Sequence, residues 1–272
     1  MMRLLSASVI DEALTRAKGM KPILFLDYDG TLTPIVNRPE QARLAPASRK
    51  VLASLADKKN WTIVVISGRG LIDVKKRVGI KGLIYAGNHG LEIVGRGVRF
   101  LHPQALRTKK IMRLLARRLT RQFTDISGIQ VEDKVFTLSI HYRRVSRKAV
   151  PQAQKLLLSS LEDVLKKRVV SLAHGKKVWE VRPNTHWNKG AAVTYLKKCL
   201  TETNGKIRPL FYFGDDVTDE SAFKTLRRRG LTVRVTRKPQ EPTAAKFYLR
   251  NSAAVIRILK ILSKSNLKGG KV

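Results

Sequence analysis

Short apolar runs alternate along this chain with longer segments in which apolar residues recur every three or four positions. Helical spacing of this kind follows the first run at residues 46–57 and the second at residues 71–76. Strands that alternate with helices predict an α/β fold with a parallel sheet and helices on both faces. The apolar runs, each typical of a buried strand, are residues 23–27, 61–67, 83–86 and 210–214.

The middle of the chain has a different pattern. Residues 103–123 and 146–168 have helical periodicity, and residues 177–182 alternate between apolar and polar side chains. Residues 131–143 also alternate, which predicts one half-buried antiparallel strand. The expected apolar face of that strand comprises Phe136, Leu138, Ile140 and Tyr142.

These middle elements predict a small α/β insert within a larger core. A chain of 272 residues allows two domains. We expect a catalytic core formed by residues 1–104 and 185–272, and an inserted cap domain formed by residues 105–184. Residues 263–272 are rich in Gly and Lys, which predicts a chain end without regular structure.

Two acidic residues, Asp27 and Asp29, lie at the end of the first predicted strand. Side chains at positions i and i+2 of an extended chain point to the same side, so the two carboxylates are expected to emerge together. Like charges at close range disfavour ionisation, which a divalent cation or a shared proton relieves. Tyr28 is expected to point to the other side and pack. The alternative is a pair of solvated loop acids or a helix N-cap.

The other three predicted strands also end in polar residues or glycine, namely Ser67, Gly87 and Asp215. Ligands of parallel α/β sheets bind beyond the carboxyl ends of the strands, so we expect the four ends to form one site. The Ser67 hydroxyl suits a phosphoryl oxygen, and it is also a favoured N-cap for the helix that follows.

The segment after the last of these strands is acidic. Asp215, Asp216, Asp219 and Glu220 place four acids within six residues of a basic chain. Mg²⁺ prefers carboxylate oxygen, so this loop is a candidate metal site facing Asp27. Acids also favour the amino-terminal end of a helix, which is the alternative for Asp219 and Glu220.

The composition of the chain is strongly basic. Lys and Arg number 55 against 20 Asp and Glu, which gives a net charge of +35. Such a balance predicts attraction to anionic substrates and polyanions. The basic residues are scattered, and no basic segment has interleaved aromatic residues, so we expect at most weak, non-specific polyanion binding. The single cysteine, Cys199, excludes an intrachain disulfide.

No apolar run approaches the ~18 residues of a membrane span. Residues 1–10 lack the long apolar region and the cleavage site of a signal peptide. We therefore expect a cytoplasmic protein without a membrane partner, and nothing in the sequence implies an obligate protein partner.

The motifs together resemble a known family of phosphatases. Asp27-Tyr28-Asp29-Gly30-Thr31-Leu32 after an apolar run is similar to the first signature of the haloacid dehalogenase superfamily. Ser67-Gly68-Arg69, Lys189-Gly190 and the acidic loop resemble its later motifs. Narrower similarity to the trehalose-phosphatase family lies in the segments 87–92, 214–220, 134–143 and 180–183, and the resemblance extends from about residue 23 to residue 261.

This resemblance implies a Rossmann-type core, a mobile α/β cap, and Mg²⁺-dependent hydrolysis of trehalose 6-phosphate through an aspartyl-phosphate. Asp27 is then the nucleophile and Asp29 the acid and base. Ser67 and Lys189 bind phosphoryl oxygens, and Mg²⁺ is held by Asp27, the Asp29 carbonyl and Asp215. Asp219 is expected to orient Lys189 or a metal-bound water. The residues expected to line the substrate site are Asp27, Tyr28, Asp29, Ser67, Gly68, Arg69, Asn88, His89, Glu92, Lys134 and Glu180.

Two alternatives stay open. One is a related sugar-phosphate phosphatase, for a glucosylglycerol phosphate or a mannosylphosphoglycerate, with the same core and different cap contacts. The other is a polyanion- or nucleic-acid-binding protein with a vestigial phosphatase site. The net charge of +35 is more basic than expected for the family and bears on any further partner rather than on catalysis.

Overall fold

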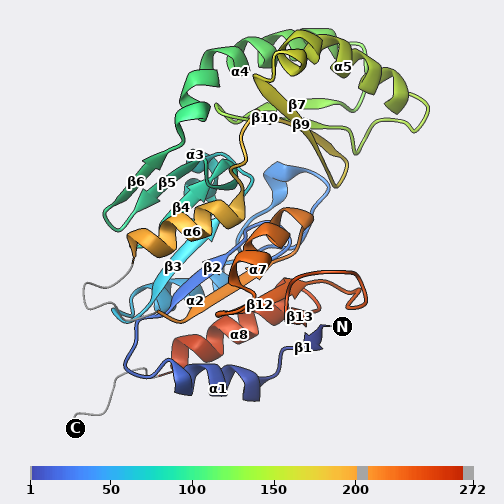
Figure 1. The fold of residues 1–272 in the computed structure, drawn as a ribbon. Helices are drawn as coiled ribbons and strands as arrows, with labels where there is room; N and C mark the ends of the chain where they lie inside the picture. The colour runs from blue at the N-terminus through green and yellow to red at the C-terminus, as the bar shows by residue number, and fades with distance from the viewer. Residues whose placement is uncertain (1, 201–207, 266–272) are drawn as a thin grey trace. The chain divides into compact units, whose positions relative to one another are not determined.

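The computed structural model describes residues 2–200 and 208–265, and the chain folds into two compact units. The first, here called the core unit, comprises residues 1–100 and 187–272. The second, the inserted unit, comprises residues 101–186. Figure 1 labels the helices and strands of both.

The core unit is built on a mixed sheet of nine strands, in the order β1-β13-β12-β11-β2-β3-β4-β5-β6. Neighbours from β1 to β4 in this order pair in parallel, and β5 pairs antiparallel with β4. The predicted α/β class is therefore confirmed. The strands are β1 (Arg3–Leu4), β2 (Ile23–Leu26), β3 (Thr62–Ile66), β4 (Ile84–Gly87), β5 (Glu92–Gly95), β6 (Val98–Leu101), β11 (Leu210–Gly214), β12 (Gly230–Val235) and β13 (Phe247–Leu249).

Helices cover both faces of this sheet, because its strands are apolar on both faces. In β2, Leu24 and Leu26 face one apolar cluster, whereas Ile23 and Phe25 face the other. The first cluster is completed by α1 (Ala7–Arg16), α2 (Pro46–Ala56), α3 (Leu71–Val78) and α8 (Ser252–Lys264), and the second by α6 (Lys189–Cys199) and α7 (Glu220–Leu226).

The inserted unit is a four-stranded antiparallel sheet, in the order β7-β8-β10-β9, packed against two helices. Its apolar cluster is formed largely by the buried stripes of the helices and by alternate residues of the strands, among them Leu138, Ile140 and Trp179. The elements are α4 (Pro103–Gln122), β7 (Gln130–Asp133), β8 (Leu138–His141), α5 (Val150–Lys166), β9 (Val170–Gly175) and β10 (Val178–Pro183).

The prediction of a single strand over residues 131–143 is wrong. Residues 134–136 form a turn, and β7 and β8 pair as an antiparallel hairpin. Val135 has a φ of 73° in this turn, and Asp133 accepts a hydrogen bond from its amide at 2.7 Å. A β-branched residue is unusual at positive φ, so the sequence carried no turn signal here.

Two further expectations concern the chain end and the membrane. Helix α8 continues to Lys264, into the segment predicted to lack regular structure, and residues 266–272 lie outside the described part of the chain. Within the described residues, no helix has the length and apolarity needed to cross a bilayer.

Candidate active site

The carboxyl ends of four neighbouring parallel strands, β11, β2, β3 and β4, lie along one edge of the core sheet. Asp215 follows β11, Asp27 follows β2, Ser67 follows β3, and Gly87 ends β4. The sheet therefore brings together the strand ends that were predicted to form a site. Asp27 continues the strand register, because its amide donates to the Phe213 carbonyl at 2.9 Å.

A buried lysine pairs with two carboxylates at this edge of the sheet. Lys189, the first residue of α6, donates to Asp27 Oδ1 at 2.6 Å and to Asp219 Oδ1 at 2.7 Å. The Lys189 side chain is 2% exposed and that of Asp27 is 6% exposed. The Asn188 side chain caps α6 by accepting from the Ala191 amide, and this fixes where the helix starts and hence where Lys189 lies.

Burial and charge oppose each other in the pKa values of this pair. Burial alone lowers the pKa of Lys189, but the charges of Asp219 and Asp27 outweigh it, and the net shift is upward. Lys189 therefore stays positive at neutral pH. Burial raises the pKa of Asp27, and Lys189 opposes that rise. A second cation beside Asp27 would favour its ionised form further.

Asp219 is saturated by protein donors. Its Oδ1 accepts from Lys189 and from the Tyr212 hydroxyl at 2.6 Å, and its Oδ2 accepts from the amides of Asp215 and Asp216 at 3.1 and 3.0 Å. An ionised carboxylate offers about four lone-pair sites, so all of them are occupied. Asp219 thus shapes the acidic loop and positions Lys189.

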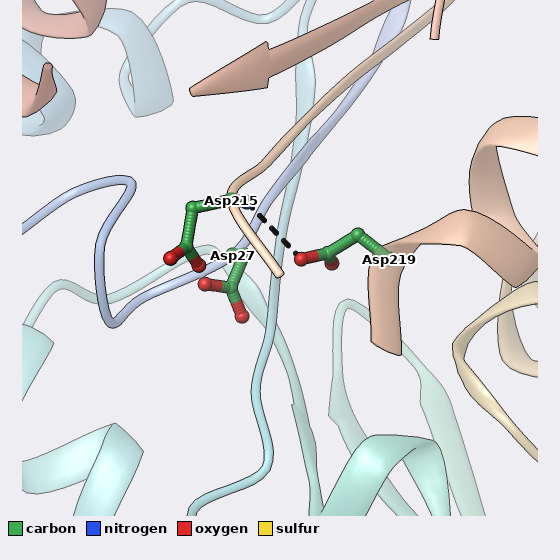
Figure 2. Close-up of side chains that lie close together, drawn as sticks. All are labelled: Asp27, Asp215 and Asp219. Carbon is green, nitrogen blue, oxygen red and sulfur yellow. Dashed lines mark hydrogen bonds between the residues drawn. The ribbon is translucent and has the colours of Figure 1, made fainter. Parts of the chain in front are cut away.

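Three carboxylates converge on the same point. One oxygen from each of Asp27, Asp215 and Asp219 lies within 4.8 Å of the other two. Figure 2 shows these three side chains close together. Gly30 permits this approach, because a Cβ on it would lie 2.3 Å from the Asp215 carboxylate, and its φ is +80°. Hard carboxylate oxygens in a buried cluster suit a divalent cation. Since Asp219 is saturated, Asp27 and Asp215 are the residues that would hold it.

Asp29 is not one of the three carboxylates of that cluster. Arg69 donates from Nε and Nη2 to the two Asp29 oxygens, each at 2.7 Å. The Asp29 side chain is 42% exposed, whereas the Arg69 side chain is 6% exposed. Strand β2 ends at Leu26, so both acids follow the strand.

Arg69 is held by more than Asp29. It also donates to Asp73 at 2.9 Å and to the Pro39 carbonyl at 2.7 Å, and Asp73 in turn accepts from Arg77. Burial lowers the pKa of Arg69, but the hydrogen bonds and charges of Asp29 and Asp73 together outweigh burial, and the net shift of the pKa is upward. The guanidinium is therefore a fixed cation that orients Asp29.

Ser67 does not cap the following helix. Its hydroxyl accepts from the Arg69 amide at 3.1 Å, and the N-cap of α3 is Gly70, which makes no side-chain cap bond. The chain needs a turn between the strand end and the helix, so the helix starts too late for Ser67. Ser67 is 1% exposed and lies directly after β3.

The residues after β4 form a tight turn packed against the Ser67 segment. Asn88 and His89 have φ values of 49° and 58°, and the His89 amide donates to the Ser67 carbonyl at 2.9 Å. The Asn88 side chain donates to Glu92 at 2.7 Å. Gly68 makes room for the His89 ring, because a Cβ there would approach that ring within 2.7 Å. These predicted substrate residues thus form one substructure.

Tyr28 is a packing residue. Its ring lies in the core cluster with 0% exposure, and its hydroxyl donates to the Ala42 carbonyl at 3.0 Å. Burial raises the pKa of its phenol. Its side chain is therefore committed to the core rather than to the substrate site.

The two predicted substrate residues of the inserted unit belong to one polar cluster. Lys134 Nζ lies 3.8 Å from Glu180 and 3.9 Å from Glu132. His141 contacts Glu132 at 2.9 Å, and Arg182 donates to Glu180. Strands β7, β8 and β10 are adjacent, and Glu132, Ser139 and Glu180 are paired in register across them.

Sequence reasoning missed Tyr212 and Glu132 as members of these clusters. Tyr212 lies two residues before Gly214 in an apolar strand, where its hydroxyl gave no signal. Glu132 lies two residues before Lys134, a spacing that places the two side chains on one side of an extended chain and was available as a signal.

Comparisons with known proteins agree with one another. The trehalose-phosphatase family matches residues 25–253. Trehalose-phosphate phosphatase B of Arabidopsis thaliana is 34% identical over 266 residues, which cover 94% of this chain and 70% of that protein. The C-terminal domain of C. albicans trehalose-6-phosphate phosphatase is 24% identical with a TM-score of 0.78, covering 97% of this chain and 99% of that one. The Aspergillus fumigatus trehalose-6-phosphate phosphatase is 26% identical with a TM-score of 0.66, covering 98% and 100% respectively.

Proposed function

The chain belongs to the trehalose-phosphatase family, and from this premise we propose that it hydrolyses trehalose 6-phosphate to trehalose and phosphate. The observation that carries the proposal is the buried cluster of Lys189, Asp27, Asp215 and Asp219 at the sheet edge. Among the related sugar phosphates, this substrate is favoured by the names of the relatives. A role in polyanion binding with a vestigial site has no comparable support.

Asp27 is proposed to attack the phosphorus atom and form an aspartyl-phosphate, which water then hydrolyses. Lys189 occupies Asp27 Oδ1, so Oδ2 is the oxygen left for attack. Asp29 is proposed to protonate the departing sugar oxygen and later to take a proton from the attacking water. Its carboxylate must then exchange its Arg69 hydrogen bonds for contacts with the substrate.

Lys189 and Ser67 are proposed to bind phosphoryl oxygens, because the Lys189 ammonium contacts Asp27 from the start of α6 and the Ser67 hydroxyl follows β3, the strand next to β2. Asp27 and Asp215, with the Asp29 carbonyl, are proposed to hold Mg²⁺. When bound, that cation would offset charge on the phosphate. Asp219 positions Lys189 and the amides of the acidic loop.

A panel of sugar phosphates tests this function directly. Phosphate release from trehalose 6-phosphate should exceed that from glucosylglycerol phosphate and mannosylphosphoglycerate. EDTA should lower the rate to background, and added Mg²⁺ should restore it, because Asp27 and Asp215 need a cation between them. Full activity after thorough chelation would contradict the metal role. Activity on every substrate alike would contradict the choice of sugar.

The inserted unit is proposed to act as the cap that selects the sugar. Lys134 and Glu180 offer a cation and an acceptor that can pair with sugar hydroxyls, and a buried polar group rejects ligands that leave it unpaired. The cluster around them would hold both side chains in fixed positions. Closure of a cap would also exclude water until the intermediate forms.

Substitution in this cluster should separate recognition from chemistry. Lys134→Ala and Glu180→Ala should lower kcat/KM for trehalose 6-phosphate by about 10- to 100-fold, the effect of one or two lost charged hydrogen bonds. Hydrolysis of p-nitrophenyl phosphate, which has no sugar, should change less than about threefold. Lys155→Ala, on the exposed face of α5, serves as the control. Equal losses on both substrates would argue against a role in sugar recognition.

A further inference from the structure

The core unit has a cavity at the amino-terminal edge of its sheet, opposite the edge that carries the candidate active site. Its volume is about 640 Å³, within the range of small-molecule sites. The first residues of β11 and β12 form part of its wall, and α1 forms another part. Because β11 leads from this cavity to Asp215, the two sites lie at opposite ends of the same strand.

The rim of this cavity is strongly basic. Among the described residues of the lining, Glu12 is the only acidic one, and it pairs with Arg16 at 2.5 Å. Six cationic side chains also line the cavity, so its described lining residues have an excess of five positive charges. These cations are Arg3, Arg16, Arg208, Arg228, Arg229 and Lys246.

Some of these cations are held by hydrogen bonds within the protein, and others are available to bind an anion. Arg208 donates to the Leu200 carbonyl at 3.0 Å and to Thr62 Oγ1 at 2.6 Å, and Lys246 donates to the Gly230 carbonyl at 3.0 Å. Within the described residues, no hydrogen bond or ion pair engages the side chain of Arg228 or Arg229. Unpaired like charges around a concavity repel one another, and a bound polyanion relieves that repulsion.

The floor of the cavity is apolar, with Phe211 and Phe247 among its residues. Arg3 lies over the Phe247 ring, 5.2 Å from its centroid. An apolar floor beneath cations lowers the local dielectric and strengthens their field. Guanidinium groups bind phosphate oxygens in pairs, and several cations around one cavity suit an anion that carries several negative charges.

We propose that this cavity is a binding site for a small polyphosphate anion, a chain of phosphates that is free or carried by a nucleoside. The site is separate from the catalytic edge and does not depend on its chemistry. It also gives a role to part of the excess positive charge, since the run Arg227 to Arg229 has no place in the proposed hydrolysis.

Isothermal titration calorimetry with sodium tripolyphosphate tests this site. The buffer contains no divalent cation and has near-physiological ionic strength, which screens diffuse attraction. Wild type should bind saturably. The double variant R228Q/R229Q should weaken binding at least about tenfold, because two phosphate-pairing cations are lost. R117Q/R118Q makes the same charge change on the exposed face of α4 and should stay within about twofold of wild type.

Further measurements identify the ligand and show whether each variant keeps its fold. ATP that binds more tightly than tripolyphosphate would indicate a nucleoside on the apolar floor, and equal affinity would indicate the phosphate chain alone. Arg3→Gln, on β1, should also weaken binding, and unfolding midpoints should match wild type. If the unfolding midpoint of R228Q/R229Q differs from that of wild type, the affinity of Arg3→Gln for tripolyphosphate tests the proposal instead. The proposal would be overturned if wild type did not bind tripolyphosphate, or if both double variants weakened binding equally. It would also be overturned if only Asp27→Asn altered binding.

Discussion

Asn in place of Asp27 should abolish phosphatase activity, with kcat falling by at least about 10³-fold. An amide oxygen is a poor nucleophile, and the neutral side chain also loses its charge pairing with Lys189. No phosphoenzyme should form when the variant is mixed with radiolabelled trehalose 6-phosphate and quenched in acid. Phosphate release and trapped label together separate loss of the nucleophile from a slowed second step.

The control for Asp27→Asn is Asp11→Asn, which removes the charge of an exposed carboxylate on α1. It should keep wild-type turnover. Thermal unfolding of both variants shows whether the fold is retained, because the loss of one carboxylate leaves Lys189 paired with Asp219. Wild-type turnover in Asp27→Asn would refute the nucleophile assignment.

The sequence predicted the strands that carry the site better than the rest of the sheet. Strands β2, β3, β4 and β11 are covered by helices on both faces, so each is a continuous apolar run that ends in a polar residue or glycine. Strands β1 and β13 have two and three residues, too few for any period to appear. They depend on pairing with β12 and with each other, which no local pattern reveals.

Within the site, the sequence predicted which charged residue types are present but not which acid pairs with which base. The residue types at strand ends indicated carboxylates and a hydroxyl, and the family resemblance added Lys189 at the start of a helix. Which carboxylate pairs with which cation depends on where β2 ends and on the turn at Gly30. Arg69, which contacts Asp29, lies in the turn before α3, and the hydrophobic pattern does not show where that helix starts.

Methionine in place of Lys189 should be the most destabilising single change at the site. Lys189 lies between Asp27 and Asp219, whose side chains are 6% and 0% exposed, so its removal leaves two buried carboxylates facing each other. Breaking a buried pair by removing one partner costs about 3–5 kcal/mol of the free energy of unfolding. Activity should be lost as well.

The matched control is Lys198→Met, an exposed lysine in the last turn of the same helix. It should leave the free energy of unfolding and the activity close to wild type. Urea denaturation measures both variants, and a lower midpoint at an unchanged m-value indicates lost stability rather than a changed unfolded state.

The pH dependence of Lys189→Met provides a second readout. Burial raises the pKa of Asp27, and the variant lacks the lysine that opposes this rise. A carboxyl with a higher pKa in the folded state binds more protons there than in the unfolded state, so stability falls as the pH rises above the unfolded value. In EDTA, the deficit of the variant should therefore shrink as the pH falls from about 8 to about 5. A deficit that stays constant over this range would show that the cost comes from packing and not from unpaired carboxylates.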